Sequence, residues 1–535
     1  MKCPSCGGSL YYDIEQKKLQ CHHCKSLFDP EKLSTDNTAQ EDVFAGSRLY
    51  ICKQCGAELL TDNDEAVTYC SYCGSEAILQ SELSGIHRPR YILPFKISKK
   101  RCKEIYRQEL KGKWYVPKEF RDPEFIEKFR PFYIPYWMYT VQFRRDPFKL
   151  EGYQNYYSRG YDYHEEYELK AVLHHDGLYG VPYDASRNFD DSIAEAIAPF
   201  KRKGMVDFHP GYLAGMYADK PNVDAGLYEE EVLERATEEA FNDIKTDFGN
   251  IELKLPRKKK QQEFLESHLA GEDTVFLPVW FLTWRSRDRV AYAVVNGQTG
   301  KIHIDLPADM KQFLFFTLGG AVLLFVLLSL FLSVTSRFVL WFSALLLYLS
   351  GRRYYKELKE IRDRENHVFD KGYLLNDEDE LPMSEKARAR ARRRGLSGGN
   401  ISSPVILLFL FAAMFFSFEV LGFFYDLLVS QTGAIGITAI VLILQLILSL
   451  KSLNVARNLK KKHSLLVLLL AMTAIGYSFY TAYSQPVQDW WYYLGSLASL
   501  GAAALMCIDL IARYNETSTR PLPSFYERKG GDDHA

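Results

Sequence analysis

The sequence predicts a multidomain protein with two small four-cysteine ribbons, a cytoplasmic α+β domain and an all-α transmembrane part of about six helices. Two observations carry this prediction. Eight of the ten cysteines form four Cys-x-x-Cys pairs before residue 74. The long apolar runs lie after residue 311, although the mean hydropathy of the whole chain is −0.20. The net charge of −1, from 66 basic and 67 acidic residues, gives no global argument for nucleic-acid binding.

Each ribbon is predicted from two Cys-x-x-Cys pairs that are separated by 14 residues, and the second set repeats the first at an offset of 49 residues. Residues 1–30 contain no apolar signal segment, so we expect a reducing cytoplasm, where paired cysteines favour a metal over disulfides. Zn²⁺ accepts four thiolates tetrahedrally, and such a closed set leaves no position for water. We therefore predict two structural Zn²⁺ sites, in domains 1–35 and 49–82. Their ligands are Cys3, Cys6, Cys21, Cys24, Cys52, Cys55, Cys70 and Cys73.

Such ribbons have other uses. A redox role for Cys-x-x-Cys needs a thioredoxin-like βαβ unit, and none is predicted around these pairs. Zinc ribbons also bind nucleic acid, but the second ribbon is acidic, with Lys53 opposed by residues such as Glu58 and Glu65. Because these carboxylates would repel a phosphate backbone, we expect the ribbons to bind protein.

Residues 90–308 have the mixed pattern of an α+β domain. Ser98 is a candidate N-cap for a helix that runs to about Gly112. Apolar residues at helical spacing predict a second helix around Val232 and Ile244. No Walker loop, G-x-G-x-x-G, G-x-S-x-G or H-E-x-x-H motif occurs, so the sequence specifies no reaction and no catalytic residue.

A basic stretch opens this domain. Between Arg88 and Lys113 there are ten basic residues and two acidic ones. A solvated basic helix explains this pattern, and a contact with anionic lipid or nucleic acid is the alternative.

The second half of the chain is dominated by apolar segments. Its first run, from Gln312 to Val334, has 23 uncharged residues, which is long enough to span a bilayer core. The predicted spans are 312–334, 337–350, 404–425, 433–450, 464–483 and 490–512. They divide this half into a transmembrane hairpin (311–351), a basic cytoplasmic segment (352–401), a four-helix transmembrane region (402–512) and a cytoplasmic tail (513–535).

Loop charge predicts the orientation of these spans. Segment 352–401 carries 13 Lys and Arg, and segment 451–463 carries five. Segments 426–432 and 484–489 carry none. The alternation places both termini and the ribbons in the cytoplasm, with the basic segments next to membrane lipid.

Two polar residues inside predicted spans, Glu419 and Gln445, form a candidate intramembrane polar site. A transport pathway usually needs several partnered ionisable groups, so a position that pairs helices or lies at the membrane interface explains Glu419 better. The pair nevertheless keeps a transporter or channel as an alternative function.

Six motifs carry a resemblance to a known family. They are Tyr50-Ile-Cys-Lys-Gln-Cys-Gly, Tyr69-Cys-Ser-Tyr-Cys-Gly, Tyr133-Ile-Pro-Tyr-Trp, Pro210-Gly-Tyr-Leu-Ala-Gly-Met-Tyr-Ala-Asp, Leu277-Pro-Val-Trp and Val295-Asn-Gly-Gln-Thr-Gly-Lys. They resemble the TFIIB-type zinc-ribbon membrane proteins of Gram-positive bacteria (YdjG-like), over roughly residues 50–350. The resemblance implies a non-enzymatic scaffold that helps recruit SPFH-like or phage-shock-A-like proteins to the membrane during envelope stress. It does not extend to residues 351–535.

The leading hypothesis is therefore an integral membrane scaffold or adaptor, not an enzyme, whose cytoplasmic zinc ribbons recruit protein partners. A transporter or channel with a regulatory ribbon front is the alternative, and membrane-tethered nucleic-acid binding is a third.

Overall fold

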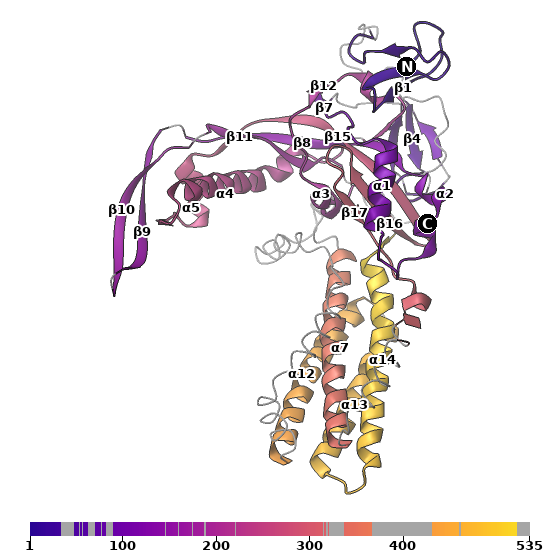
Figure 1. Ribbon diagram of the computed structural model, residues 1–535, viewed down its shortest axis with the longest axis vertical. Coiled ribbons are helices and arrows are strands. Elements are labelled where there is room, and N and C mark those ends of the chain that lie inside the picture. Colours follow the sequence, from indigo (N-terminus) through magenta and orange to yellow (C-terminus); the bar gives the residue numbers. More distant parts are fainter. Residues whose placement is uncertain are drawn as a thin grey trace, which may run out of the picture.

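The computed structural model describes most of residues 1–319, 336–365 and 431–521. The ranges 34–47, 62–69, 82–88, 320–335, 366–430 and 522–535 lie outside the described part, with a few single residues and pairs elsewhere. The molecule is elongated, with a β-rich part at one end and a helical bundle at the other (Figure 1). A two-stranded arm projects sideways from the β-rich part.

The β-rich part contains the predicted α+β domain. Its longest strands, β8 (Arg130–Gln142) and β15 (His268–Ser286), pair antiparallel. Strand β16 (Arg289–Asn296) pairs with β15, and β11 (Gly177–Asp184) pairs with β8. These strands are rich in aromatic and β-branched residues, which suit a pleated and buried surface. The sheet therefore forms the core to which the other elements attach.

The remaining elements of this part are short. They are β1 (Leu10–Asp13), β2 (Lys18–Cys21), β3 (Leu27–Phe28), β4 (Arg48–Cys52), β5 (Glu58–Thr61), β6 (Ile78–Ser81), β7 (Tyr91–Ile92), β12 (Val206–Asp207), β13 (Tyr217–Ala218), β17 (Ile302–Ile304), α1 (Lys99–Glu109), α2 (Pro123–Ile126) and α3 (Asp191–Ile197). Helix α1 begins directly after Ser98, as predicted. Strands β4, β5 and β6 join the large sheet through β13, so the second ribbon is continuous with the domain.

The sideways arm consists of β9 (Phe148–Ser158) and β10 (Tyr161–Ala171), which pair along their whole length. Strand β14 (Glu252–Lys254) adds to β9, and α5 (Lys258–Leu265) follows it. Helix α4 (Glu229–Phe248) lies at the base of the arm and buries the predicted apolar face. That face consists of Val232, Ala236, Ala240, Phe241 and Ile244.

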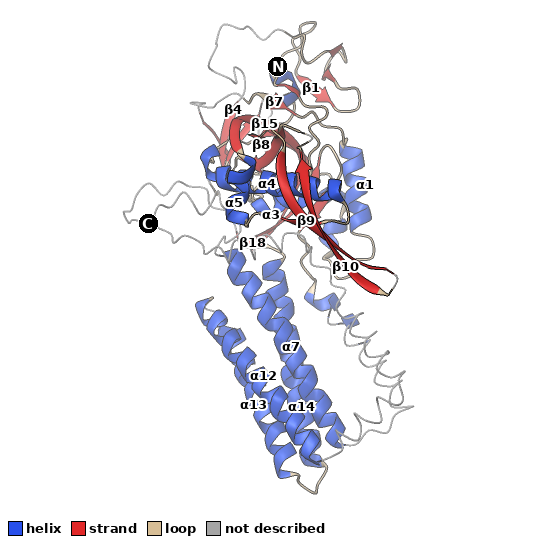
Figure 2. Cartoon of the chain, turned by 90° about the vertical axis from the view of Figure 1, so that its left-hand side faces the viewer, coloured by secondary structure: helices blue, strands red, loops and turns tan. Residues whose placement is uncertain are grey.

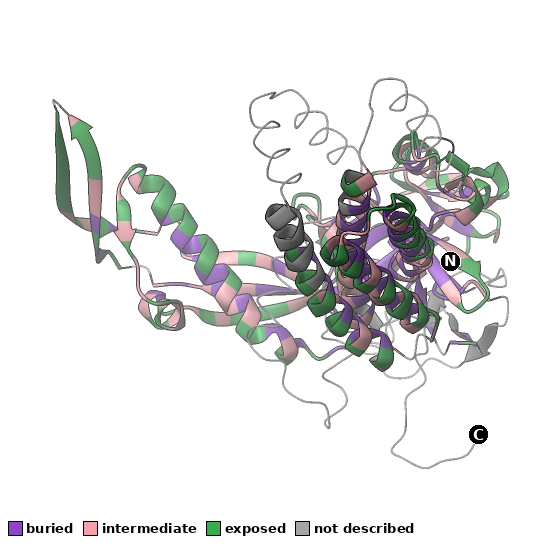
Figure 3. Ribbon diagram, turned by 90° about the horizontal axis from the view of Figure 1, so that it is seen from below, coloured by how far each residue is buried: buried purple, intermediate pink, exposed green. Residues whose placement is uncertain are grey.

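The bundle contains α7 (Ser336–Glu365), α12 (Gln431–Asn458), α13 (Lys462–Ser484) and α14 (Trp490–Thr517), which run side by side (Figure 2). Seen from below, its helices turn buried residues inward and exposed residues outward (Figure 3). The buried core includes Leu347, Tyr354, Leu468, Ala503 and Met506.

The prediction of about six transmembrane helices is wrong. Within the part of the chain that the structure describes, two helices are long and apolar enough to cross a membrane, His463–Ser484 and Trp490–Thr517. The predicted spans 464–483 and 490–512 fall in them. All of the predicted span 404–425 and most of 312–334 lie outside the described residues.

The other two predicted spans, 337–350 and 433–450, belong to helices that are longer than predicted. Helix α7 continues beyond residue 350 to Glu365 through a charged stretch that packs into the bundle, where Glu357 is buried. Helix α12 likewise continues beyond residue 450, to Asn458. On α7 the apolar run is followed by a charged stretch that packs against neighbouring helices, and hydropathy alone does not predict this packing.

Candidate metal centres

The first predicted cysteine set converges on one point. The Sγ atoms of Cys3, Cys6, Cys21 and Cys24 lie within 4.8 Å of one another. The Cys3–Cys24 and Cys6–Cys21 sulfur distances are 3.6 Å and 3.5 Å. Zn–S bonds of about 2.3 Å in a tetrahedron place two sulfurs about 3.8 Å apart. The spacing and chemistry of this set therefore fit a tetrahedral zinc ion.

The second set has the same geometry. The sulfurs of Cys52, Cys55, Cys70 and Cys73 also lie within 4.8 Å of one another. The Cys52–Cys73 distance is 3.5 Å and the Cys55–Cys70 distance is 3.8 Å. Four sulfurs at these distances fill a tetrahedral coordination sphere, so zinc bound here would have a structural role.

Tight backbone turns close the Cys3–Cys6 and Cys70–Cys73 pairs. The Gly7 amide donates to the Cys3 carbonyl at 2.8 Å, and the Gly74 amide donates to the Cys70 carbonyl at 2.9 Å. Both glycines have a positive φ, 71° and 67° respectively. Because residues with a Cβ are strained in this conformation, glycine is the residue that the turn favours.

In the first set, hydrogen bonding favours a thiolate at Cys24 but not at Cys6. The side chain and backbone of Ser26 lower the pKa of Cys24 to about 6. At Cys6, the Gly8 amide acts to lower the pKa, but hydrogen bonds with Cys24 and Cys21 outweigh it and raise the pKa to about 12. Four neighbouring thiols thus cannot all ionise by themselves, and a divalent cation would supply the missing positive charge.

The two sets differ in their exposure to solvent. Cys6 and Cys24 are exposed, whereas all four cysteines of the second set are fully buried. We therefore expect a thiol-reactive mercurial to release zinc in two phases, because it reaches the first set without local unfolding. A chromogenic zinc indicator would follow this release, and the Cys6→Ser variant should lack the fast phase. Release in a single phase would contradict the difference in access.

The first ribbon is attached to a 3₁₀ turn, Pro210–Leu213. The Tyr12 amide donates to the Ala214 carbonyl at 2.9 Å, and the Tyr12 and Tyr212 rings lie 5.3 Å apart. A Cβ on Gly215 would lie 3.0 Å from the Cβ of Tyr11. The motif that begins at Pro210 therefore packs closely against the first ribbon and holds it on the domain.

The second ribbon is held by the end of the same motif. Tyr72, between Cys70 and Cys73, is buried and donates from its hydroxyl to Asp219 at 2.6 Å. Burial and the nearby Asp219 carboxylate raise the pKa of Tyr72 well above its usual value, so the phenol stays protonated. Ser186 also donates to Asp219. One segment of ten residues thus fixes both ribbons to the domain.

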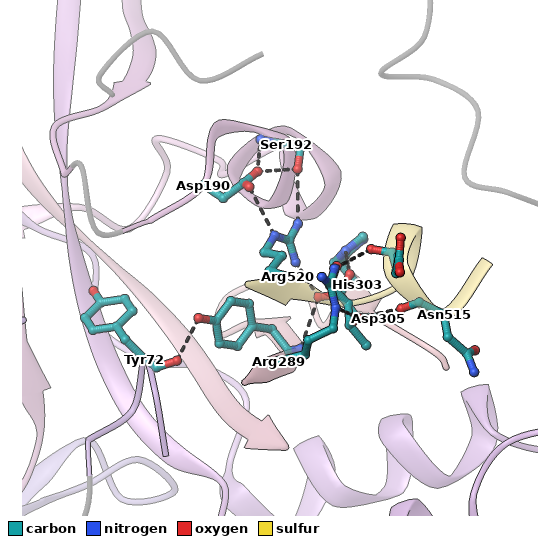
Figure 4. A network of polar contacts seen from close by, with 11 residues as sticks. Tyr72, Asp190, Ser192, Arg289, His303, Asp305, Asn515 and Arg520 are labelled. Carbon is teal, nitrogen blue, oxygen red and sulfur yellow. Dashed lines mark hydrogen bonds and ion pairs between the residues drawn. The ribbon is translucent and has the colours of Figure 1, made fainter. Parts of the chain in front are cut away.

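A buried ion-pair clamp joins the bundle to the sheet (Figure 4). After α14, strand β18 (Arg520–Pro521) pairs with β16. The guanidinium of Arg520 donates to Asp305 and, at 3.1 Å, to Asp190. Arg520 and Asp305 are only 7% and 5% exposed. Buried ion pairs therefore hold the segment that follows α14 within the α+β domain.

Further hydrogen bonds reinforce this junction. Arg289 donates to the carbonyl oxygens of Glu516 and Thr519 at 2.6 Å and 2.8 Å. Asn515 exchanges two hydrogen bonds with the backbone of Ala308. The bond to Glu516 satisfies a carbonyl group that a helix leaves open at its C-terminus.

The clamp also contacts the second ribbon. The Arg520 guanidinium lies over the Tyr292 ring at 5.5 Å, and the Tyr292 hydroxyl donates to the Tyr72 carbonyl at 2.7 Å. A continuous set of buried contacts therefore runs from the second cysteine set to the end of the bundle. In the sequence, an indication of these contacts is Tyr72, an aromatic residue between Cys70 and Cys73.

The candidate intramembrane site is described in part. Glu419 lies outside the described residues. Gln445 is buried on α12 and lies against α7, where a Cβ on Gly351 would be 2.6 Å from its Oε1 atom. Its amide donates to Ser449 at 3.4 Å. This position fits a residue that pairs two helices through close backbone approach.

The chain is similar to the uncharacterized protein YdjG of Bacillus subtilis (strain 168). The two are 29% identical over 309 residues, which is 56% of this chain and 88% of YdjG. No family model and no solved structure matches the chain. The distant homology supports the resemblance to YdjG-like proteins of Gram-positive bacteria, and both cysteine sets fit zinc ribbons.

Proposed function

We propose that this protein is a non-enzymatic, membrane-anchored adaptor. The observation that carries the proposal is the placement of two closed four-cysteine sites in the β-rich part of the molecule, outside the bundle (Figure 1). With four thiolates, a bound zinc ion would have no open position for a substrate or water. Zinc would order the ribbons, and the bundle would hold them at the inner surface of the cell membrane.

The dimensions of α14 support membrane insertion. Its rise from Trp490 to Asp509 is about 29 Å, close to the thickness of a bilayer core. Large apolar side chains along this stretch are exposed, including Leu497, Leu500 and Leu505. Trp490 and Tyr493 are exposed at its start, where aromatic residues suit a membrane interface. Together with the loop charges, this supports a cytoplasmic position for the ribbons.

The arm supports a protein partner. It carries four exposed tyrosines near its tip, and Tyr157 and Tyr161 are each 71% exposed. Tyrosine is enriched at protein interfaces because its large rigid ring combines apolar area with a hydroxyl group. The arm and the first ribbon are therefore the surfaces that we assign to the partner. SPFH-like or phage-shock-A-like proteins in the envelope-stress response are the partner classes that the resemblance implies.

The test is affinity purification of the tagged protein from mild detergent, with identification of the co-purifying proteins by mass spectrometry. We expect a cytoplasmic partner that is lost from the Cys6→Ser/Cys24→Ser variant and from the Tyr157→Ala/Tyr161→Ala variant. Lys149→Ala lies on the exposed base of the same arm and should retain it. Full retention by both test variants would contradict recruitment through these surfaces.

A further inference from the structure

We propose that the α+β domain carries a second membrane contact, a surface that binds the headgroups of anionic lipids. It consists of Lys111, Lys113, Trp114, Lys118, Phe315 and Phe316, which we call the basic aromatic patch. The proposal rests on the membrane insertion of the bundle and adds to it a lipid preference. Nothing in the proposed adaptor function requires that preference.

The patch lies beside the end of the bundle. The Trp114 ring stacks on Phe313, with ring centroids 5.9 Å apart, and touches the Phe316 ring at 4.7 Å. The Asp309 amide donates to the Tyr115 carbonyl at 2.7 Å. The same short segment is joined to α14 through the hydrogen bonds between its Ala308 and Asn515. These contacts thus fix the position of the patch along the axis of α14.

This position corresponds to the headgroup layer. The apolar stretch of α14 ends at Asp509, its first charged residue. Asn515 lies about 9 Å further along the helix axis. The polar layer on each side of a bilayer core is about 5–8 Å thick. The patch therefore lies at or just outside the inner headgroups when α14 spans the bilayer core.

The exposed groups of the patch match that environment. Trp114, Phe315 and Phe316 are 41%, 75% and 53% exposed. Lys113 is paired with Glu109 at 2.5 Å, whereas Lys111 and Lys118 are exposed and form no ion pair within the described part of the chain. Aromatic side chains favour the interface, and unpaired cations next to it attract anionic lipid.

The sequence around the patch also carries a net positive charge. From Lys99 to Arg121 there are nine basic residues and three acidic ones. Nucleic acid would also be attracted by this charge. The exposed aromatic cluster at headgroup height favours lipid, because aromatic side chains are enriched at the membrane interface.

The experiment uses the full chain in nanodiscs of phosphatidylcholine, with or without phosphatidylglycerol, and measures hydrogen–deuterium exchange. We expect peptides covering residues 109–121 to exchange about tenfold more slowly in the anionic discs. The Lys111→Glu/Lys118→Glu variant should lose this difference. Lys149→Glu/Lys170→Glu makes the same charge change on the arm and should keep it. Trp114→Ala should weaken the protection without removing its dependence on phosphatidylglycerol.

Several outcomes would overturn the proposal. Equal exchange of residues 109–121 in both kinds of disc, for a chain that co-elutes with lipid, rejects the patch and leaves the membrane anchoring intact. A chain that does not enter the discs rejects the anchoring and the patch together. Protection by inorganic phosphate in neutral discs assigns the site to free phosphate, and protection there by a single-stranded oligonucleotide assigns it to nucleic acid.

Discussion

Replacing Cys52 and Cys55 by serine should remove zinc from the second ribbon and unfold the sheet around it. Structural zinc sites contribute about 10–16 kcal/mol of binding free energy, which is comparable to the whole stability of a domain. The second set is fully buried, and its strands continue into the large sheet through β13. Loss of the ion would therefore be transmitted to the core. Elemental analysis should show one zinc ion per chain in place of two, with a large loss of thermal stability.

Two variants serve as controls for this result. Cys6→Ser/Cys24→Ser removes the same number of thiols from the first ribbon, where both residues are exposed. It should also lose one zinc ion but leave the α+β domain folded, because that ribbon forms its own three-stranded sheet. Cys507→Ser, on α14, should retain both ions. An unchanged zinc content or melting temperature in Cys52→Ser/Cys55→Ser would refute a structural metal at this site.

The different roles expected of the ribbons follow from how they are attached. The sequence predicts two equal units, because both repeat the same cysteine spacing. In the structure, Tyr72 of the second ribbon reaches Asp219, 147 residues further along the chain. A spacing pattern defines local turns and ligands, but it carries no information about such distant partners. The ligand sets could thus be predicted, while the integration of the second ribbon could not.

In the apolar second half of the chain, the sequence predicts the helices but not which of them are apolar along their whole length. Hydropathy located α13 and α14 well, because their apolar character extends around most of the helix. It failed on α7, whose charged second half is stabilised by pairs such as Arg353 and Glu357 at 2.5 Å. A window average registers composition but not which face is buried. The bundle is therefore predictable as helices, but not as a number of spans.

The motif from Pro210 to Asp219 gains a physical meaning from the structure. Its first part seats the first ribbon through Tyr212 and Ala214, and its last residue binds Tyr72. A short segment that holds two ribbons must combine glycines for close approach with a buried carboxylate. This requirement gives a physical reason for the glycines and for Asp219 in the segment.

Replacing Arg520 by methionine should detach the bundle from the sheet and destabilise the protein by about 3–5 kcal/mol. The change takes the guanidinium away from Asp190 and from the buried Asp305, which keeps its contacts with His303 at 3.3 Å and with the Tyr292 amide at 3.1 Å. Hydrogen–deuterium exchange should show faster exchange in β16 and in the last turn of α14. Thermal unfolding in detergent would give the loss of stability.

Two further variants separate the buried charge from the lost side chain. Arg101→Met removes a guanidinium from an exposed pair with Glu104, which contributes less than about 1 kcal/mol. Arg520→Met/Asp305→Asn also removes the buried carboxylate charge and should recover part of the stability, because the cost lies mainly in a buried carboxylate that has lost its guanidinium partner. If Arg520→Met were no more harmful than Arg101→Met, the clamp could not be what joins the bundle to the domain. In that case the hydrogen bonds of Arg289 and Asn515 and the pairing of β18 with β16 would hold the junction.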